Sequence, residues 1–181
     1  MTRWATWAVG AGLVAAAWGV AAVTPADDAE EAPFPVVVEL GDRGVGRNIA
    51  VTVTDVRRVE SVSAGEWSAE GNWVVVDLDA EAVQSEFGTL LTLATLQVDG
   101  RTFRASERPE SLLRGGLSVG IPLSGSVAFE LPEGLDGGHA MLTFGLDTDP
   151  RLDSLLVADI DLGAIELDRE AELQPTDWST P

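Results

Sequence analysis

Between residues 36 and 165, apolar residues recur at every second position in short runs, and turn-forming residues separate the runs. The clearest run extends from Trp73 to Ala82 and alternates apolar with acidic residues. A period of two places successive side chains on opposite faces of a β-strand, so that one face is buried and the other lies in water. We expect the acidic face, formed by Asp77, Asp79 and Glu81, to be solvated. The pattern is not that of a core built from amphipathic helices.

Eight runs of this kind predict about eight short strands. Between two of them lies Asp99-Gly100, a pair suited to the positive φ angles of a type I′ hairpin turn. The alternation slips after Asp55, which indicates a β-bulge or a strand end. Together these features predict an all-β fold, an antiparallel β-sandwich, with a closed barrel as the alternative. The predicted strands are residues 36–40, 48–54, 73–82, 90–98, 101–106, 126–131, 140–146 and 155–162.

Near its start the chain has an uncharged segment, Trp4 to Val23, that follows Arg3. Its 20 residues would form a helix about 30 Å long, which is the hydrocarbon thickness of a bilayer. The segment predicts either an uncleaved transmembrane anchor or a cleaved signal peptide with its cleavage site near Val20-Ala21-Ala22. In both cases we expect the residues after Val23 to lie outside the cytoplasm, because Arg3 precedes the segment.

Composition divides the chain into four parts. Residues 1–23 are the signal anchor or signal peptide, and residues 24–35 are an acidic linker rich in proline and alanine. Residues 36–165 are the β-sandwich domain, which is long enough to bury its own core. Residues 166–181 are acidic and contain two prolines, and we expect this tail to be disordered.

Charge and residue content exclude several classes of function. The formal net charge is −19, which disfavours nucleic acid as a partner because binding to phosphates needs clustered Lys and Arg. The chain has no cysteine, so it has no thiol nucleophile, disulfide or lipid-modified cysteine. Its one histidine, His139, follows two glycines and is expected to be an exposed loop residue rather than a catalytic base. We therefore expect no catalytic residues and no cofactor.

Four stretches carry a resemblance to a known bacterial family. Each has a recognisable feature: a glycine before an apolar strand, the Asp-Gly hairpin, a strand that ends in Leu-Pro, and a closing Asp-Leu-Gly. On these features the chain resembles the immunoglobulin-like domain of unknown function in secreted, lipid-anchored or membrane-anchored Gram-positive proteins, related in fold to the secreted immunogenic protein of mycobacteria. The resemblance implies an immunoglobulin-like β-sandwich in an extracytoplasmic, actinobacterial protein. The stretches are residues 71–82, 96–106, 119–134 and 152–163; the chain departs from the family at Glu81-Ala82-Val83, where members often carry an asparagine.

A loop with three aspartates is the candidate metal site. Asp147, Asp149 and Asp153 lie close together in sequence, and carboxylate oxygens are the ligands that Ca²⁺ prefers. The spacing lacks the glycine and the terminal glutamate of an EF-hand loop. The alternative is that Asp147 and Asp149 cap a turn before Pro150.

A possible binding surface lies on and after the predicted Asp-Gly hairpin. It consists of Trp67, Arg101, Arg104 and Arg108, and Arg114 belongs to the same basic cluster. These arginines are expected either to bind an anionic ligand or to pair locally with Glu107 and Glu110. The glycine-rich loop 112–125 would form the rim of such a surface. Trp73, at the start of its strand, is expected in the core against the opposite sheet.

These observations predict a non-catalytic binding or interaction module on the outside of the cell. Its expected partners are the membrane, through Trp4 to Val23, and a protein at the cell surface. The alternatives are an accessory subunit of a membrane complex, recruited through its helix, and a hydrolase that uses an acid pair or a divalent ion.

Overall fold

The computed structural model describes residues 3–23, 32–84, 89–135 and 137–178. The chain divides into two compact units, Met1–Ala32 and Pro33–Pro181. The first unit contains one helix, α1 (Arg3–Val23), and the second contains the strands. Residues 24–31, which make up most of the predicted acidic linker, lie outside the described residues.

Helix α1 coincides with the predicted targeting segment. Within the ranges that the structure describes, no helix is both long enough and apolar enough to cross a membrane. The prediction of a transmembrane anchor at Trp4–Val23 is therefore not supported. The alternative, a cleaved signal peptide, stays a prediction.

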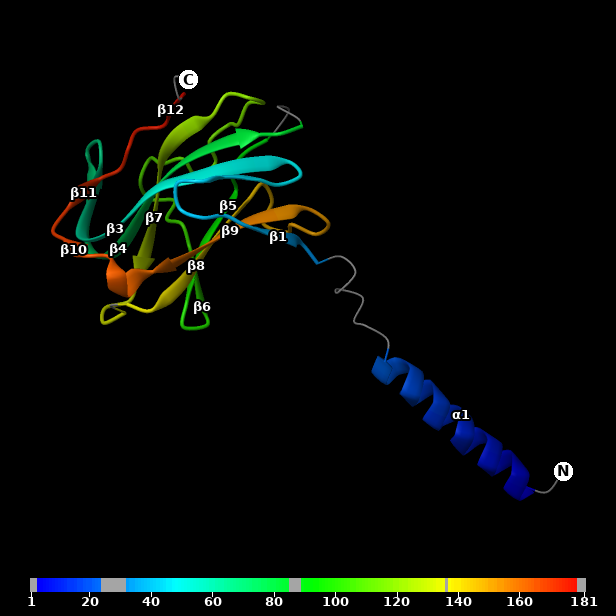
Figure 1. The fold of residues 1–181 in the computed structure, drawn as a ribbon. Helices are drawn as coiled ribbons and strands as arrows, with labels where there is room; N and C mark the ends of the chain where they lie inside the picture. Colours follow the sequence, from blue (N-terminus) through cyan, green and yellow to red (C-terminus); the bar gives the residue numbers. More distant parts are fainter. Residues whose placement is uncertain (1–2, 24–31, 85–88, 136, 179–181) are drawn as a thin grey trace. The chain divides into compact units, whose positions relative to one another are not determined.

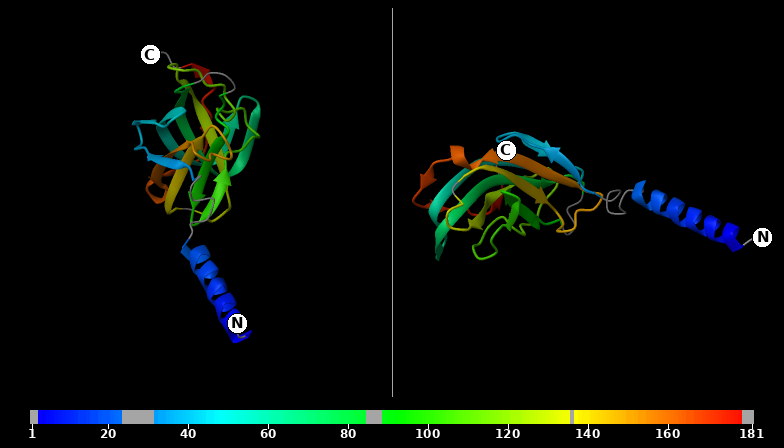
Figure 2. Two further views of the ribbon diagram at one scale, coloured as in Figure 1. Left: turned by 90° about the vertical axis from the view of Figure 1, so that its right-hand side faces the viewer. Right: turned by 90° about the horizontal axis from the view of Figure 1, so that it is seen from below.

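The second unit is a two-layer β-sandwich (Figures 1 and 2). One sheet has five strands in the order β1-β9-β8-β5-β6, and the other has seven, in the order β10-β3-β4-β7-β12 with β2 and β11 also paired to β3. A short 3₁₀ helix, η1 (Leu162–Ala164), follows β9. The strands are β1 (Phe34–Val37), β2 (Arg43–Val45), β3 (Ile49–Ala64), β4 (Trp67–Ala82), β5 (Leu93–Val98), β6 (Arg101–Arg104), β7 (Leu123–Leu131), β8 (His139–Gly145), β9 (Ser154–Asp161), β10 (Leu167–Asp168), β11 (Ala171–Glu172) and β12 (Asp177–Trp178).

The eight predicted strands are all present, with shifted ends. Asp99 and Gly100 have φ angles of 49° and 73°, which confirms the predicted turn between β5 and β6. The register of β3 against β4 shifts between Val53 and Asp55, so the slip in the pattern is a bulge and β3 continues beyond it. The sandwich is not purely antiparallel, since β1 runs parallel to β9, and β10 and β11 run parallel to β3.

The main core lies between the two sheets. The alternation of β4 places Val74, Val76 and Leu78 there, each at most 1% exposed. Residues Val127 and Phe129 of β7 join them, as the pattern predicts. Since β3, β4 and β7 are neighbours in one sheet, this face of the seven-stranded sheet forms half of the interior. The five-stranded sheet supplies the other half, including Leu96, Leu142, Phe144, Leu156 and Ile160.

A second, smaller core lies on the opposite face of the seven-stranded sheet. Trp73 is fully buried there, against Val59 and Val75, rather than against the other sheet as the sequence predicts. Ala171 and Leu173 of the C-terminal tail pack in the same cluster. The indole of Trp73 thus faces away from the sandwich interior and is covered by the end of the chain.

The prediction of a disordered tail at residues 166–181 is wrong for the part that the structure describes. β10 and β11 pair with β3, and β12 pairs with β7. The tail is ordered because Ala171 and Leu173 are buried, at 7% and 4% exposed, and because Gln174 hydrogen-bonds the sheet. Its acidic composition conceals these few apolar contacts.

Candidate functional site

The acidic face of β4 is not the solvated surface that the alternation predicts. Asp77 and Glu81 are only 2% and 6% exposed. Asp77 accepts hydrogen bonds from Arg57, at 2.6 and 2.7 Å, from the Ser126 hydroxyl at 2.5 Å and from the Gln174 side chain at 3.1 Å. Its charge is therefore compensated and its oxygens are occupied. Arg57 of β3 and the tail together shield this carboxylate from water.

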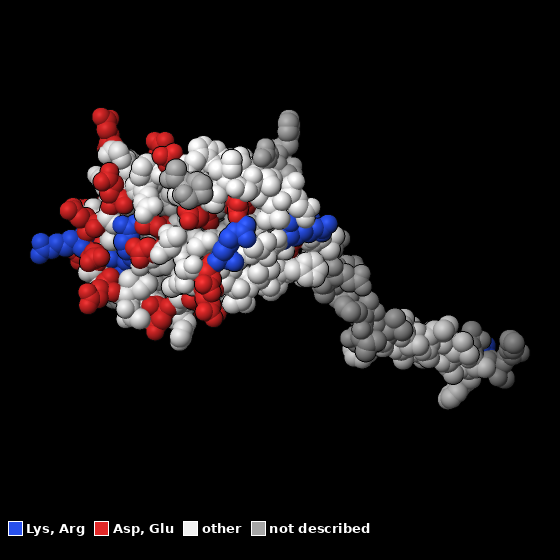
Figure 3. Space-filling model, turned by 45° about the horizontal axis from the view of Figure 1, so that its top comes forward, with Lys and Arg blue, Asp and Glu red and all other residues white. Residues whose placement is uncertain are grey.

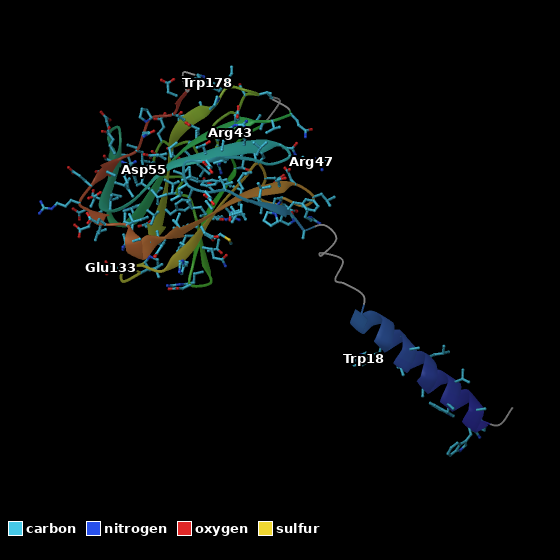
Figure 4. The ribbon with its side chains drawn as sticks, viewed as in Figure 1. Trp18, Arg43, Arg47, Asp55, Glu133 and Trp178 are labelled. Carbon is cyan, nitrogen blue, oxygen red and sulfur yellow. The ribbon has the colours of Figure 1, made fainter. Side chains whose placement is uncertain are left out.

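Glu81 is paired in the same way at the other end of the strand. Arg43 of β2, labelled in Figure 4, donates to its carboxylate through Nε at 2.7 Å and also through Nη2. Asp79, between the two buried acids, accepts a hydrogen bond from the Ser124 hydroxyl. Each of the three carboxylates is thus bound to another strand of the same sheet, and together they connect β4 with β2, β3 and β7.

The three aspartates of the candidate calcium loop do not converge. Asp147 accepts a hydrogen bond from the backbone N–H of Asp149 at 3.1 Å, which is the turn-capping alternative. Asp149 binds Arg151, whose guanidinium holds the pKa of this carboxyl below its ordinary value. Asp153 instead accepts from the side chain of Asn48 at 2.9 Å. Among the residues that the structure describes, no group of three or more carboxylates and imidazoles could hold a metal ion.

The residues of the predicted binding surface lie in two separate places in the structure. Trp67 and Trp73 form an edge-to-face pair with ring centroids 6.0 Å apart. The guanidinium of Arg108 lies 5.8 Å from the ring of Trp67 and 5.2 Å from that of Trp73, and it also binds Glu130. The guanidinium of Arg108 is therefore already bound within the protein, through cation–π contacts and an ion pair.

Arg101 and Arg104 lie at opposite ends of β6. Arg101 is positioned over the ring of Phe103, 5.9 Å from its centroid. Arg104 is exposed, and its guanidinium makes no hydrogen bond or ion pair with any described residue. Among the described residues, Arg104 therefore has neither an ion pair nor a ring contact, whereas Arg101 has the ring of Phe103.

Arg104 lines a hollow of about 400 Å³, which we call the Arg104 hollow. Its walls come from the start of β5, the end of β6, the loop that follows β6 and the connection from β8 to β9. Ser106 donates its backbone N–H to Ala128 of β7, so the chain crosses from one sheet to the other beside this hollow. The segments that line it are residues 92–94, 104–105, 107, 113–114 and 146–148.

Charges of both signs line the Arg104 hollow. Arg114 binds Glu107 at 2.8 Å, and both side chains of this pair are more than 60% exposed. Asp147 lies in the same wall. The pairing of Arg114 with Glu107 is the local pairing that the sequence leaves open, whereas Arg104 does not take part in it. Figure 3 shows acidic side chains spread over the face of the sandwich that it draws.

The backbone at Arg114 is held in a conformation that favours glycine. Arg114 has a φ of 67°, and the N–H of Gly115 donates to the carbonyl of Leu112 at 2.8 Å, closing the turn. The N–H of Arg114 also donates to the carbonyl of Leu91 at 2.7 Å, which fixes the loop to the chain just before β5. The wall of the hollow is therefore rigid at this point, and a costly backbone conformation presents an arginine to it.

Sequence reasoning finds Arg104 and Arg114 and places the rim of the binding surface in loop 112–125. It misses Asp147 and Thr92 as members of the same site, since they are distant in sequence. No local signal joins these segments. Only the antiparallel pairing of β5 with β8 brings the two together, as Leu93 lies opposite Gly145.

No family model matches this chain, and no curated protein matches it either. Two solved structures resemble it. A candidate lipoprotein of Staphylococcus aureus has 7% sequence identity and a TM-score of 0.47, and the match covers 74% of this chain and 97% of that one. An uncharacterised β-sandwich protein of Clostridium difficile has 12% identity and a TM-score of 0.41, over 72% of this chain and 95% of that one. Both come from Gram-positive bacteria, and neither likeness assigns a function.

Proposed function

We propose that this protein is a non-catalytic binding module outside the cytoplasm, and that its ligand site is the Arg104 hollow. The single observation that carries the proposal is the guanidinium of Arg104, which lies in the wall of that hollow and binds no carboxylate among the residues that the structure describes. The extracytoplasmic location and the immunoglobulin-like family remain part of the proposal, supported by the N-terminal segment and by the sequence motifs.

Charge supports a ligand at this position. The chain has 30 acidic residues and 11 arginines, so there is no shortage of carboxylates to pair with an arginine. Arg43 and Arg114 each bind one of them, and Arg57 binds two. An arginine that lines a hollow and binds none is available to a carboxylate or another anionic group from outside.

The size and walls of the hollow also support ligand binding. A volume of about 400 Å³ falls within the range of about 300–1,000 Å³ that is typical of small-molecule sites. Leu93, Leu113 and Leu146 supply apolar wall, while Arg104 and Thr148 supply polar groups. Six of its eleven lining residues are polar or charged, so hydrogen bonds and ion pairs as well as apolar contacts are available to a ligand.

The hydrolase alternative has less support. A catalytic acid pair would need a carboxylate that is free to take up or release a proton beside a substrate. Asp77 and Glu81 are buried and each is bound to an arginine, so both serve the packing of the sheet. His139 is exposed at the start of β8.

The test is a thermal-shift screen of the full chain against a library of small metabolites, followed by calorimetric titration of the compounds that stabilise it. We expect binding that is lost in Arg104→Ala. The matched control is Arg101→Ala, on the same strand but over Phe103, which should bind as the unmodified chain does. A screen without any stabilising compound, or binding that is equal in Arg104→Ala, would overturn the proposal.

A further inference from the structure

We propose that the Arg104 hollow binds an aliphatic α-amino acid in its zwitterionic form. The inference rests on the function proposed above and adds the chemical class of the ligand. It starts from the charged residues in the wall of the hollow. Arg104 and Arg114 are positively charged, whereas Glu107 and Asp147 are negatively charged. A site with both signs is complementary to a ligand that carries both.

The carboxylate of the ligand is assigned to Arg104. A guanidinium offers two parallel N–H donors, which match the two oxygens of a carboxylate. Arg104 has no competing partner among the described residues. Arg114 can add a second bond, because its ion pair with Glu107 is exposed and exposed pairs contribute little stability.

The ammonium group is assigned to Asp147. This carboxylate has one described hydrogen bond, from the N–H of Asp149 to Oδ1, so it keeps acceptor capacity for an ammonium group. The hydroxyl of Thr92 donates to the carbonyl of Leu146, so its lone pairs are also available to a donor.

The side chain of the ligand is assigned to the leucines. Leu93, Leu113 and Leu146 line the hollow, with Ala94 and Ala105 between them. Contact with these residues favours an aliphatic side chain, because it removes apolar surface from water.

A polyanion such as phosphate fits the site less well. Glu107 and Asp147 stand in the wall, and the whole chain has a formal charge of −19. Both repel a ligand of high negative charge, whereas a zwitterion has no net charge to be repelled.

The experiment is calorimetric titration of the full chain with four probes. L-leucine carries both charged groups, 4-methylpentanoate lacks the ammonium, L-leucinamide lacks the carboxylate, and inorganic phosphate is a bare anion. We expect L-leucine to bind, and each of the others to bind about tenfold more weakly or not at all, since each loses a charged hydrogen bond.

Two variants assign the groups. Arg104→Ala should abolish binding of L-leucine, whereas Asp147→Asn should weaken L-leucine about tenfold and leave 4-methylpentanoate unchanged. Arg101→Ala is the control and should alter neither titration. The unfolding midpoint of each variant shows whether it is folded.

The outcomes separate this inference from the proposed function. If 4-methylpentanoate or phosphate binds as tightly as L-leucine, the site binds anions and the zwitterion inference is wrong, while the binding function stands. If no probe binds but a library compound binds in an Arg104-dependent way, the inference again fails alone. If no compound of any class binds, both fail.

Discussion

The guanidinium of Arg57 lies 2.6 Å from the carboxylate of Asp77, whose side chain is only 3% exposed. The C-terminal tail binds the same carboxylate through the side chain of Gln174. The two charged side chains come from neighbouring strands, β3 and β4, directly beside the bulge of β3. This ion pair therefore joins the bulge, the sheet and the tail in one polar cluster.

Arg57→Ala is expected to destabilise the sandwich by about 3 kcal/mol, because it leaves the buried Asp77 carboxylate without its counter-charge. Urea unfolding of the two proteins measures the difference. Arg151→Ala, which removes an ion pair with Asp149 whose side chains are about 60% exposed, serves as the matched control and should change stability little. Equal effects of the two substitutions would contradict the structural role of Asp77.

Leu173→Ala is expected to destabilise the protein by about 2–4 kcal/mol, because it removes a buried side chain from the second core. Leu167→Ala, in the same tail but 51% exposed, should cost less than about 0.5 kcal/mol. Tryptophan fluorescence reports the result locally, since loss of the tail contact would let water reach Trp73. A tail that contributes nothing would give two equal and small effects.

Arg114→Gly is expected to affect stability and binding in opposite directions. Glycine accepts a φ of 67° without strain, so the variant should be as stable as the unmodified chain or up to about 1 kcal/mol more stable. Ligand binding in the Arg104 hollow should weaken, because one guanidinium is lost. Thermal unfolding and calorimetric titration test the two halves.

Leu152→Gly is the control for that experiment. Leu152 also has a positive φ, of 60°, but it does not line the hollow. Its replacement should relieve strain in the same way and leave ligand binding unchanged. If Arg114→Gly unfolds the protein, the positive φ is not the main constraint at that position.

Arg151→Ala is expected to raise the pKa of the Asp149 carboxyl towards its ordinary value, because the hydrogen bond from Arg151 is the main cause of its lowering. The folded pKa is below the unfolded one, so the pair stabilises the protein above the unfolded pKa. That contribution is lost as the pH falls through the folded pKa. NMR titration of the Asp149 carboxyl measures the shift, and Arg169→Ala, at a different place on the sandwich, should leave it unmoved.

The fold could be predicted from the sequence wherever local pattern decides the structure. The alternation of β4 predicts which of its residues fill the main core, and Asp99-Gly100 predicts the turn that joins β5 to β6. Both signals lie within a few residues of chain, so they need no knowledge of distant segments.

The prediction fails wherever a distant segment covers a surface. Asp77 has the pattern of a solvated residue, and only the tail and the long side chain of Arg57 remove it from water. The tail in turn has the composition of a disordered segment. Neither the burial of Asp77 nor the order of the tail can be predicted from local sequence, because each depends on contact with the other.

In the candidate site, too, local sequence predicts some features, whereas others depend on distant segments. The arginines after the Asp-Gly hairpin form a visible cluster in the sequence. In the structure Arg108 lies over two indole rings, while Arg104 has no partner among the described residues. The sequence alone cannot separate them. Which arginine is free depends on where the chain crosses from one sheet to the other.

The parallel pairing of β1 with β9 has a consequence for how the chain is made. Phe34 pairs with Ser154, so the first strand of the sandwich has no native strand partner until Ser154 and the residues after it have been synthesised. The tail that seals Trp73 is synthesised later still. Native closure of the sandwich therefore has to wait until the chain has been synthesised as far as Leu173.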